Sequence, residues 1–577
     1  MILQALKDYY DRKPGLPREG FEEKEIPYII VLDLNGKPVN IETTYEGQGK
    51  ERRGKKFLVP QGVKKASGIA SNLLWENPEY SLGIILRGKS IRVALQHEAF
   101  KKRINDLDAK EEPGLNAVKR FLDLPDKAAE LEVFQEPWKQ LCEESANLSF
   151  KLAGDSGIIL ERPSVREIIE KHYSLCTDEQ AVCMITGEID AVERLHPAIK
   201  GVWGAQTSGA NIVSFNKDAF CSFGKSQGAN APVGKRTVFA YTTALNHLLA
   251  RDSGQRIQAG DATTVFWAER STELEEQFAD FFSEPPKDDP DRNVRAVESL
   301  FSSVRSGVFH EEDDKNRFFV LGLAPNASRI SIRFWIVDTV KAMAEKIAQH
   351  FIDLKIVHGP KDTDVLSLLR LLSSIALEGK LDNVPPNLAG DTMRAILAGL
   401  PYPLTLLQAA VRRNRAEQKV SYARAALVKA CINRMTRKKN PHIKEELKMG
   451  LDPANMNTGY RLGRLFATFE KIQEEANPGI NATIRDRFYG AASGTPSTVF
   501  ANLMRLKNHH LAKMENTGRR IYFEKLIGEI VNDVDGKKGF PATLSLGDQG
   551  RFAIGYYHQR QEFFVKKDRD TTESKEV

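Results

Sequence analysis

Cysteine and long apolar runs are scarce in this chain of 577 residues. Only five cysteines are present, and no two of them form a C-x-x-C pair. An odd and scattered set argues against a disulfide framework and predicts a reducing compartment. No run reaches the ~18 apolar residues needed to cross a bilayer, and the N-terminus carries no secretory leader pattern. We therefore expect a soluble, cytoplasmic protein that has no membrane partner.

Catalytic motifs are also missing. The segment Gly224-Lys225-Ser226 resembles the end of a phosphate-binding loop, but Ala219 stands where that loop needs its first glycine. His97-Glu98 is not followed by a second histidine at metalloprotease spacing, and the adjacent His509-His510 pair would not share a metal easily on a helix. We predict no catalytic residue, no metal and no cofactor. Carboxylate pairs that meet only in the fold stay open as an alternative.

Charge is nearly balanced over the whole chain. There are 83 basic and 77 acidic side chains, which gives a net charge of +6. This excess is too small to indicate a nucleic-acid partner by itself, so the argument depends on where the basic residues cluster. With 41% hydrophobic and 28% charged residues, the chain is globular and long enough for three or four domains.

A first basic cluster lies near residues 50–65, where Glu51 is the only acid. Glycines separate its cations, so the segment reads as a loop that can place ammonium and guanidinium groups along phosphates. Asn72 follows, and an asparagine amide can pair with an adenine edge. A solvated basic loop is the other interpretation. The candidate DNA-binding residues of this cluster are Arg52, Arg53, Lys64, Lys65, Ser67 and Asn72.

A second basic cluster lies at 411–440, where ten cations face a single acid, Glu417. Helical spacing places several of these cations on one stripe beside an apolar face. A helix face of one sign favours an anionic partner, either a nucleic-acid strand or an acidic protein. The candidates for strand or subunit docking are Arg412, Arg413, Arg415, Arg424 and Arg434.

The segment 183–250 is rich in glycine and side-chain amides. A backbone of this kind can approach a ligand closely, although a set of surface turns would have the same composition. Several of its asparagines are equally suited to cap turns and helices. The candidate base-reading and phosphate-holding residues are Gln206, Asn211, Lys225, Gln227 and Asn230.

The hydrophobic periodicity predicts an α+β protein, in which a mixed α/β N-terminal region precedes an all-α C-terminal helical bundle. A hairpin is expected at 27–45 through Asn35-Gly36, and further strands at 82–86, 237–241, 263–270 and 318–336. One helix is expected at 127–146. Four helices are expected from 458 onward. The predicted regions are 1–180 (mixed α/β with the basic loop), 181–337 (the Gly/amide-rich region), 338–455 (helical with a basic face) and 456–577 (a four-helix bundle).

A longer pattern now supports a family resemblance. The stretch from Cys183 to Leu249 contains GANIVSFN, FGKSQGANAPV and YTTALN, with FLVP and NLLWENPEYSLG upstream and TTVFWAER downstream. The chain resembles the large subunit of the type I-C CRISPR surveillance complex (Cascade) over its whole length. The resemblance implies a non-catalytic subunit that recognises the protospacer-adjacent motif (PAM) on double-stranded DNA, helps to unwind it and stabilises the R-loop.

The same resemblance implies the partners. These are the backbone subunits that carry the guide RNA, the target duplex and its displaced strand, a helicase–nuclease, and small subunits related to the chain's own C-terminal bundle. Such a small subunit could start at Met449 or Met456, which both precede the bundle. Two alternatives remain: a metal-dependent nuclease or nucleotidyl transferase acting on nucleic acid, and a scaffold that never contacts DNA.

Overall fold

The computed structural model describes residues 1–47, 49, 52–63, 68–86, 89–108, 111–174, 180–306, 315–532 and 539–564. The chain groups into two compact units, 1–199 with 211–247 and 200–210 with 248–577. Sheets and helices mix in the N-terminal half and helices alone follow residue 339, which confirms the predicted α+β class. The four-part division of the chain stays a prediction.

The first unit is built around a three-stranded sheet of order β3-β2-β7. The central strand β2 (Tyr28–Leu32) is wholly buried, pairs antiparallel with β3 (Pro38–Thr43) and parallel with β7 (Leu148–Leu152). The predicted hairpin is confirmed. Its turn needs glycine, because Gly36 has φ +82° and a Cβ there would lie 2.7 Å from the Ala117 carbonyl oxygen.

Helices pack against this sheet through apolar side chains. Phe100, Phe121 and Phe150 form one aromatic group, with ring centroids 5.8 to 6.4 Å apart where they meet. The predicted helix at 127–146 is two helices, because the chain breaks at Gln135, whose φ is +46°. The predicted strand at 82–86 is wrong, since this stretch follows a helix as coil. The helices are α1 (Ile2–Arg12), α2 (Pro78–Ser81), α3 (Ser90–Asn105), α4 (Pro113–Leu122), α5 (Lys127–Glu132), α6 (Glu136–Glu144) and α7 (Pro163–Ser174).

Short two-stranded ribbons complete the first unit. They pair β1 (Phe21–Glu25) with β6 (Lys56–Pro60), β4 (Tyr45–Glu46) with β5 (Arg53–Gly54), and β8 (Gln180–Val182) with β9 (Ile189–Ala191).

Helix α8 (Lys235–Leu248) corrects the strand predicted at 237–241. The β-branched and aromatic residues there have strand propensity, but Val238, Tyr241, Leu245 and Leu248 recur at helical spacing and are all buried. Packing of the apolar stripe therefore decided the local structure.

The second unit begins with an antiparallel sheet of order β10-β11-β12-β13. Its strands are β10 (Arg256–Ala259), β11 (Ala262–Ala268), β12 (Arg317–Asn326) and β13 (Arg329–Thr339). These confirm the strands predicted at 263–270 and 318–336. A bulge between Gly322 and Leu323 shifts the register beside Phe334, whose ring covers the glycine. Ile332 is consequently 45% exposed, although sequence alternation placed it with buried neighbours.

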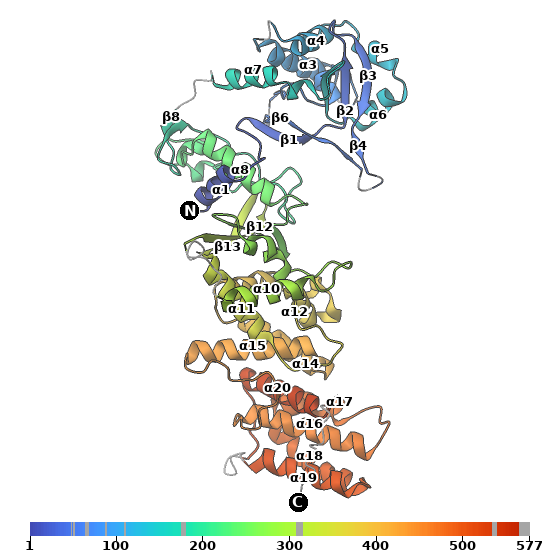
Figure 1. Cartoon of the computed structure of the whole chain (residues 1–577), viewed down its shortest axis with the longest axis vertical. Coiled ribbons are helices and arrows are strands. Elements are labelled where there is room, and N and C mark those ends of the chain that lie inside the picture. Colours follow the sequence, from blue (N-terminus) through green and yellow to red (C-terminus); the bar gives the residue numbers. More distant parts are fainter. Residues whose placement is uncertain are drawn as a thin grey trace, which may run out of the picture. The chain divides into compact units, whose positions relative to one another are not determined.

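Helices from α9 onward share one continuous core with this sheet. Within the unit, α11 packs on α15 and α15 packs on α20, so the helical layers follow one another away from the sheet (Figure 1). The first of these helices are α9 (Glu273–Gln277), α10 (Arg292–Ser306), α11 (Val340–Leu354), α12 (Leu368–Ile375), α13 (Pro386–Leu397), α14 (Leu404–Glu417) and α15 (Tyr422–Lys439).

The C-terminal bundle has five helices among the described residues, one more than predicted. They are α16 (Thr458–Ala476), α17 (Ile484–Gly494), α18 (Phe500–Lys513), α19 (Thr517–Asn532) and α20 (Leu546–Glu562). Helix α17 was missed because its eleven residues carry glycine at both Gly490 and Gly494 and only a weak apolar stripe. Across the described part of the chain, no helix is long and apolar enough to cross a membrane.

Candidate nucleic-acid interface

A braced loop in the first unit carries three of the predicted DNA-binding residues. The Asn230 amide oxygen accepts the Ser222 N–H at 2.8 Å, and its NH2 group donates to the carbonyls of Lys225 and Gln227 at 3.1 and 2.9 Å. Through these three hydrogen bonds, the Asn230 side chain holds residues 222–227 in place. Lys225 lies exposed at the surface of this loop. Asn230 is therefore a positioning residue, and Lys225 is the group that a ligand can reach.

Gln227 is tied to a second cation. Its side-chain oxygen accepts two hydrogen bonds from the Arg194 guanidinium, at 2.9 and 3.1 Å. The next residue, Gly228, is buried against the backbone of Glu193, where a Cβ would lie 2.4 Å from the carbonyl oxygen. A small recess of about 60 Å³ opens beside this contact, lined by Arg194, Leu195, His196, Asn211, Val213, Ser214, Phe215, Asn216, Gln227 and Gly228. The lining combines polar side chains with three apolar ones, Leu195, Val213 and Phe215.

The remaining two amides of this segment differ in their surroundings. Asn211 lines the same recess, and its NH2 group donates to the His196 carbonyl at 2.8 Å. Gln206 is exposed but belongs to the second unit. The structure therefore brings Asn211, Gln227 and Asn230 together in one unit and leaves Gln206 outside this group.

The first basic cluster lies partly within the described residues. Arg52 is held by an ion pair with Glu144 at 2.9 Å, and its guanidinium carbon lies 3.8 Å from the Tyr45 ring centroid. Burial opposes ionisation of Glu144, but hydrogen bonds from Tyr45, Tyr28 and Arg52 outweigh it and lower the carboxyl pKa. Arg53 on β5 is exposed. Lys64, Lys65 and Ser67 lie outside the described residues.

Asn72 has a structural position instead of a ligand-facing one. Its side chain is only 6% exposed, and its amide oxygen accepts the Val63 N–H at 3.0 Å. Its own N–H donates to Glu76 at 3.1 Å, and the neighbouring Ser71 carbonyl accepts from Arg103. The sequence interpretation of Asn72 as a base reader is corrected to an anchor that ties Val63 to Glu76. An amide buried and bonded in this way does not present its edge to a base.

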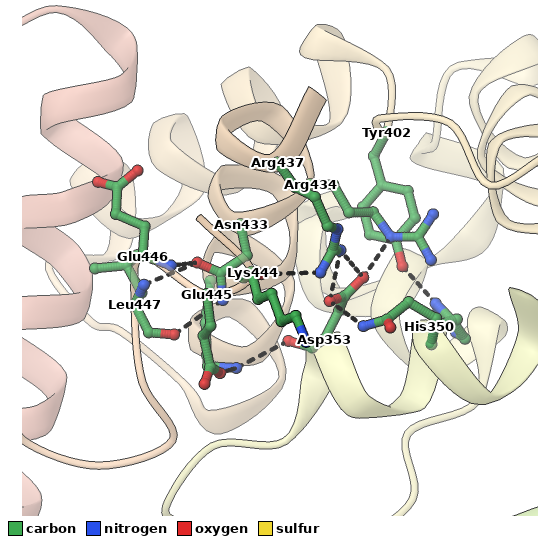
Figure 2. Close-up of polar contacts among 12 residues, drawn as sticks. His350, Asp353, Tyr402, Asn433, Arg434, Arg437, Lys444, Glu445, Glu446 and Leu447 are labelled. Carbon is green, nitrogen blue, oxygen red and sulfur yellow. Dashed lines mark hydrogen bonds and ion pairs between the residues drawn. The ribbon is translucent and has the colours of Figure 1, made fainter. Parts of the chain in front are cut away.

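Half of the second basic cluster is paired inside the fold, contrary to the predicted one-signed face. Arg434 is 5% exposed and donates to Asp353 at 2.8 Å, and Arg437 donates to both oxygens of the same carboxylate at 2.8 Å. Figure 2 shows both guanidinium groups reaching Asp353, which comes from α11. Arg434 also lies 4.5 Å from the Tyr402 ring centroid. The counter-ion is outside the 411–440 window, so the window's own charge count did not include it.

Other members of the cluster are paired in the same way. Lys429 is fully buried and binds Glu445 at 2.9 Å and the Asp353 carbonyl at 3.2 Å. Asn433 holds the following segment through the N–H groups of Glu446 and Leu447, at 3.1 and 2.8 Å (Figure 2). This part of α15 therefore fastens the segment that leads to the C-terminal bundle.

At the other end of the cluster, the Glu417 carboxylate forms ion pairs with both Arg413 and Arg424. Burial works against ionisation of Glu417, but the two guanidinium groups outweigh it and lower its pKa. Arg424 is 5% exposed and also donates to Ser421 at 3.1 Å. Of the five docking candidates, only Arg412 and Arg415 keep exposed side chains. The prediction that Arg424 and Arg434 meet a strand is corrected for this reason.

A different basic surface lies on α18 and was not singled out from the sequence. Asn502, Arg505, His509 and Lys513 follow at spacings of three and four, are all exposed, and form the α18 stripe. The helix contains no acid, and within the described residues no carboxylate pairs with Arg505 or Lys513. The signal available in the sequence was this absence of acids along a helix whose other face, including Leu503 and Leu511, is buried.

Metal chemistry finds no support in the geometry described. In the ranges that the structure covers, no group of three histidine, cysteine or carboxylate side chains is arranged to hold a metal ion. The cysteines at 142, 183, 221 and 431 are free thiols. The polar side chains at the recess are amides, a hydroxyl, an imidazole and a guanidinium, which suit binding of an anion or a base edge.

A family model described as CRISPR-associated protein (Cas_Csd1) matches residues 6–564. No curated protein matches the chain. The match covers both compact units.

Proposed function

The chain belongs to the CRISPR-associated family Cas_Csd1, and from this we propose that it is the non-catalytic large subunit of a type I-C Cascade. In this role it recognises the PAM on double-stranded DNA, helps to unwind the duplex, stabilises the R-loop and recruits a separate helicase–nuclease. Base pairing with the guide RNA reads the target sequence, so the protein needs only a few base-reading groups and a basic surface.

The observation that supports PAM reading is the polar recess of the first unit with its braced loop. Arg194 and Gln227 are joined there by two hydrogen bonds, and Lys225 is exposed on the adjoining loop. Amide and guanidinium groups are the side chains that discriminate base edges, while lysine binds phosphate as a point charge. The recess is too small to enclose a large substrate, so its polar side chains would meet a base at the surface.

Stabilisation of the displaced strand is assigned here to the α18 stripe. Its cations have no internal counter-ion among the described residues, so they are available for phosphates. The buried pairs of α15 cannot serve in this way, because breaking them would leave Asp353 unpaired. This assignment replaces the 411–440 face as the surface for a single strand.

The decisive test measures duplex binding by the assembled complex, with and without this chain. The targets differ only in the three base pairs that flank the protospacer. We expect discrimination among flanks to disappear when the chain is omitted. If discrimination persists without the chain, another subunit reads the PAM and the proposal fails.

The nuclease and scaffold alternatives need their own assays. Purified chain is incubated with plasmid, Mg²⁺ and Mn²⁺, and we expect no cleavage. Metal-dependent cutting that survives repurification and disappears with a carboxylate substitution would establish the enzyme. A scaffold that never touches DNA would leave duplex affinity and its salt dependence unchanged after Lys225→Ala, whereas we expect weaker binding to every duplex.

A further inference from the structure

Phe223 is the most exposed large apolar side chain among the described residues, with 99% of its surface open to solvent. It stands at the tip of the loop that Asn230 braces. The Lys225 N–H donates to the Ser222 carbonyl at 3.0 Å, which closes a tight turn with Phe223 and Gly224 in the middle. Both central residues have positive φ, +54° and +68°, as in a type I′ turn.

The fold does not need an aromatic ring at this position. A type I′ turn prefers Asn, Asp or Gly at its first central residue, because side chains with a bulky Cβ are strained in the left-handed region. The Phe223 ring also gains no burial that would offset this strain. Phe223 therefore lowers the stability of the fold through backbone strain and through an apolar ring left in water. A contact with a partner would explain why the position carries a phenylalanine.

The loop is rigid enough to present the ring in a fixed direction. Asn230 bonds the backbone on both sides of the turn, at Ser222 and Lys225. Below it, Gln227 is fixed by Arg194 and Gly228 is packed on Glu193. A preorganised tip loses little conformational entropy when it inserts into a ligand.

The surroundings of the ring match nucleic acid. Lys225 lies two residues beyond Phe223, and Lys217 is exposed on the same loop region. Between Asn211 and Arg236 there are four cations, and Asp218 is the only acid. In sequence, Phe223 lies between two exposed lysines. This combination suits a base with its neighbouring phosphates, because aromatic side chains stack on unpaired bases and wedge between base steps.

We propose that Phe223 is a stacking wedge that inserts where the target duplex is first opened, while Lys217 and Lys225 bind the adjoining phosphates. This inference rests on the proposed function and names the residue that holds the first opened bases apart. Stacking of one aromatic side chain on a base is expected to change binding by roughly tenfold.

The test uses the assembled complex with Phe223→Asn, which suits the positive φ and removes the ring. Binding is measured on a fully paired target and on the same target with a mismatched bubble beside the PAM. Permanganate reactivity of thymines at that position reports opening. We expect binding to weaken by about tenfold on both targets, because the stack on unpaired bases is lost on each, and permanganate reactivity to fall on the paired target alone.

Controls separate the ring from general effects. Phe223→Trp keeps an aromatic face and should retain opening, whereas Ile189→Ala removes a 72% exposed apolar side chain from β9 of the same unit and should change nothing. The melting temperature of Phe223→Asn should equal or exceed that of the wild type, which a structural role for the ring would reverse.

Two results overturn the inference. Phe223→Asn could open the paired target as well as the wild type does, or it could bind the bubble target with wild-type affinity, which would show that the ring does not stack on opened bases. Failure of the proposed function is distinguishable, because it appears in the wild-type complex as flank discrimination that does not depend on this chain.

Discussion

Asp353 is the residue on which the buried charges of the second unit depend. Its side chain is 3% exposed and accepts Arg434, Arg437 and the Gln349 amide. Asp353→Asn would leave two guanidinium groups without their counter-ion, one of them buried. We expect a loss of about 3–5 kcal/mol in the free energy of unfolding, measured by denaturant titration.

The matched control for that substitution is Asp364→Asn. Asp364 is 81% exposed and pairs with His358 at 2.9 Å, so its loss should cost no more than about 1 kcal/mol. Equal unfolding midpoints for Asp353→Asn and the wild type would show that the two arginines find water or other partners.

His558 gives a prediction about pH. Its side chain is 1% exposed and shares a hydrogen bond of 3.0 Å with the Tyr460 hydroxyl. Burial and the nearby Lys429 charge lower its pKa to about 4. The unfolded chain takes up this proton near pH 6.5, so folding stability is complete above that pH and falls between about pH 6.5 and pH 4. The loss amounts to about 3 kcal/mol.

His558→Gln removes the titrating group and keeps a polar side chain. We expect its unfolding free energy to depend less on pH between 6.5 and 4 than that of the wild type, whatever its absolute stability. Parallel pH profiles for the two proteins would contradict the assignment. His350, His97 and His510, whose pKa values burial also lowers, contribute to the slope that remains.

Single residues show what the sequence could and could not predict. The exposure of Lys225 and Arg53 followed from composition, because glycine-rich polar segments lie at the surface. The pairing of Arg434 did not, because Asp353 lies 81 positions away and nothing in the 411–440 window indicates it. Asn72 was misread because an amide looks the same in sequence whether it anchors a loop or reads a base.

At the scale of elements, the crossing of α16 and α20 depends on glycine. A Cβ on Gly463 would lie 2.0 Å from the Phe552 carbonyl oxygen and 2.7 Å from the Tyr556 nitrogen. Gly463→Ala must push the two helices apart, and we expect a loss of about 1–3 kcal/mol in thermal or denaturant unfolding.

Gly528→Ala on α19 is the control for this substitution. A Cβ there meets nothing within 4 Å, so alanine should raise stability by up to ~1 kcal/mol through its better helix propensity. Opposite signs for the two glycines are the expected result. Two stabilising substitutions would mean that the helices can shift without cost.

Element predictions succeeded where period and caps agreed. The first of the helices predicted from 458 onward matches α16, because Asn457 caps it and its apolar residues keep helical spacing. Part of helix α8 was predicted as a strand, because local propensity opposed the helical spacing that its packing uses. Such conflicts are resolved by tertiary burial, which a sequence window does not contain.

At the scale of the whole molecule, the two compact units carry different parts of the proposed work. The first unit holds the polar recess and the Phe223 loop, and the second holds the α18 stripe. The sequence predicted the change from mixed α/β to helices correctly. It counted Arg424 and Arg434 among the docking cations although both are buried in ion pairs, because charge counts do not separate exposed cations from paired ones.

The last prediction concerns this strand-binding surface. Arg505→Gln combined with Lys513→Gln removes two exposed cations from an acid-free helix. Each phosphate contact with a single strand contributes about 0.7 to the slope of log affinity against log salt, so the double variant should flatten that slope by about 1.4. The readout is single-strand binding by the full chain over a salt series. Lys438→Gln with Lys439→Gln removes the same charge from the exposed end of α15 and should leave the slope nearly unchanged. Because the two double variants have equal net charge, only a local contact on α18 produces a difference between them. Equal slopes would show that the single strand binds to another part of the molecule.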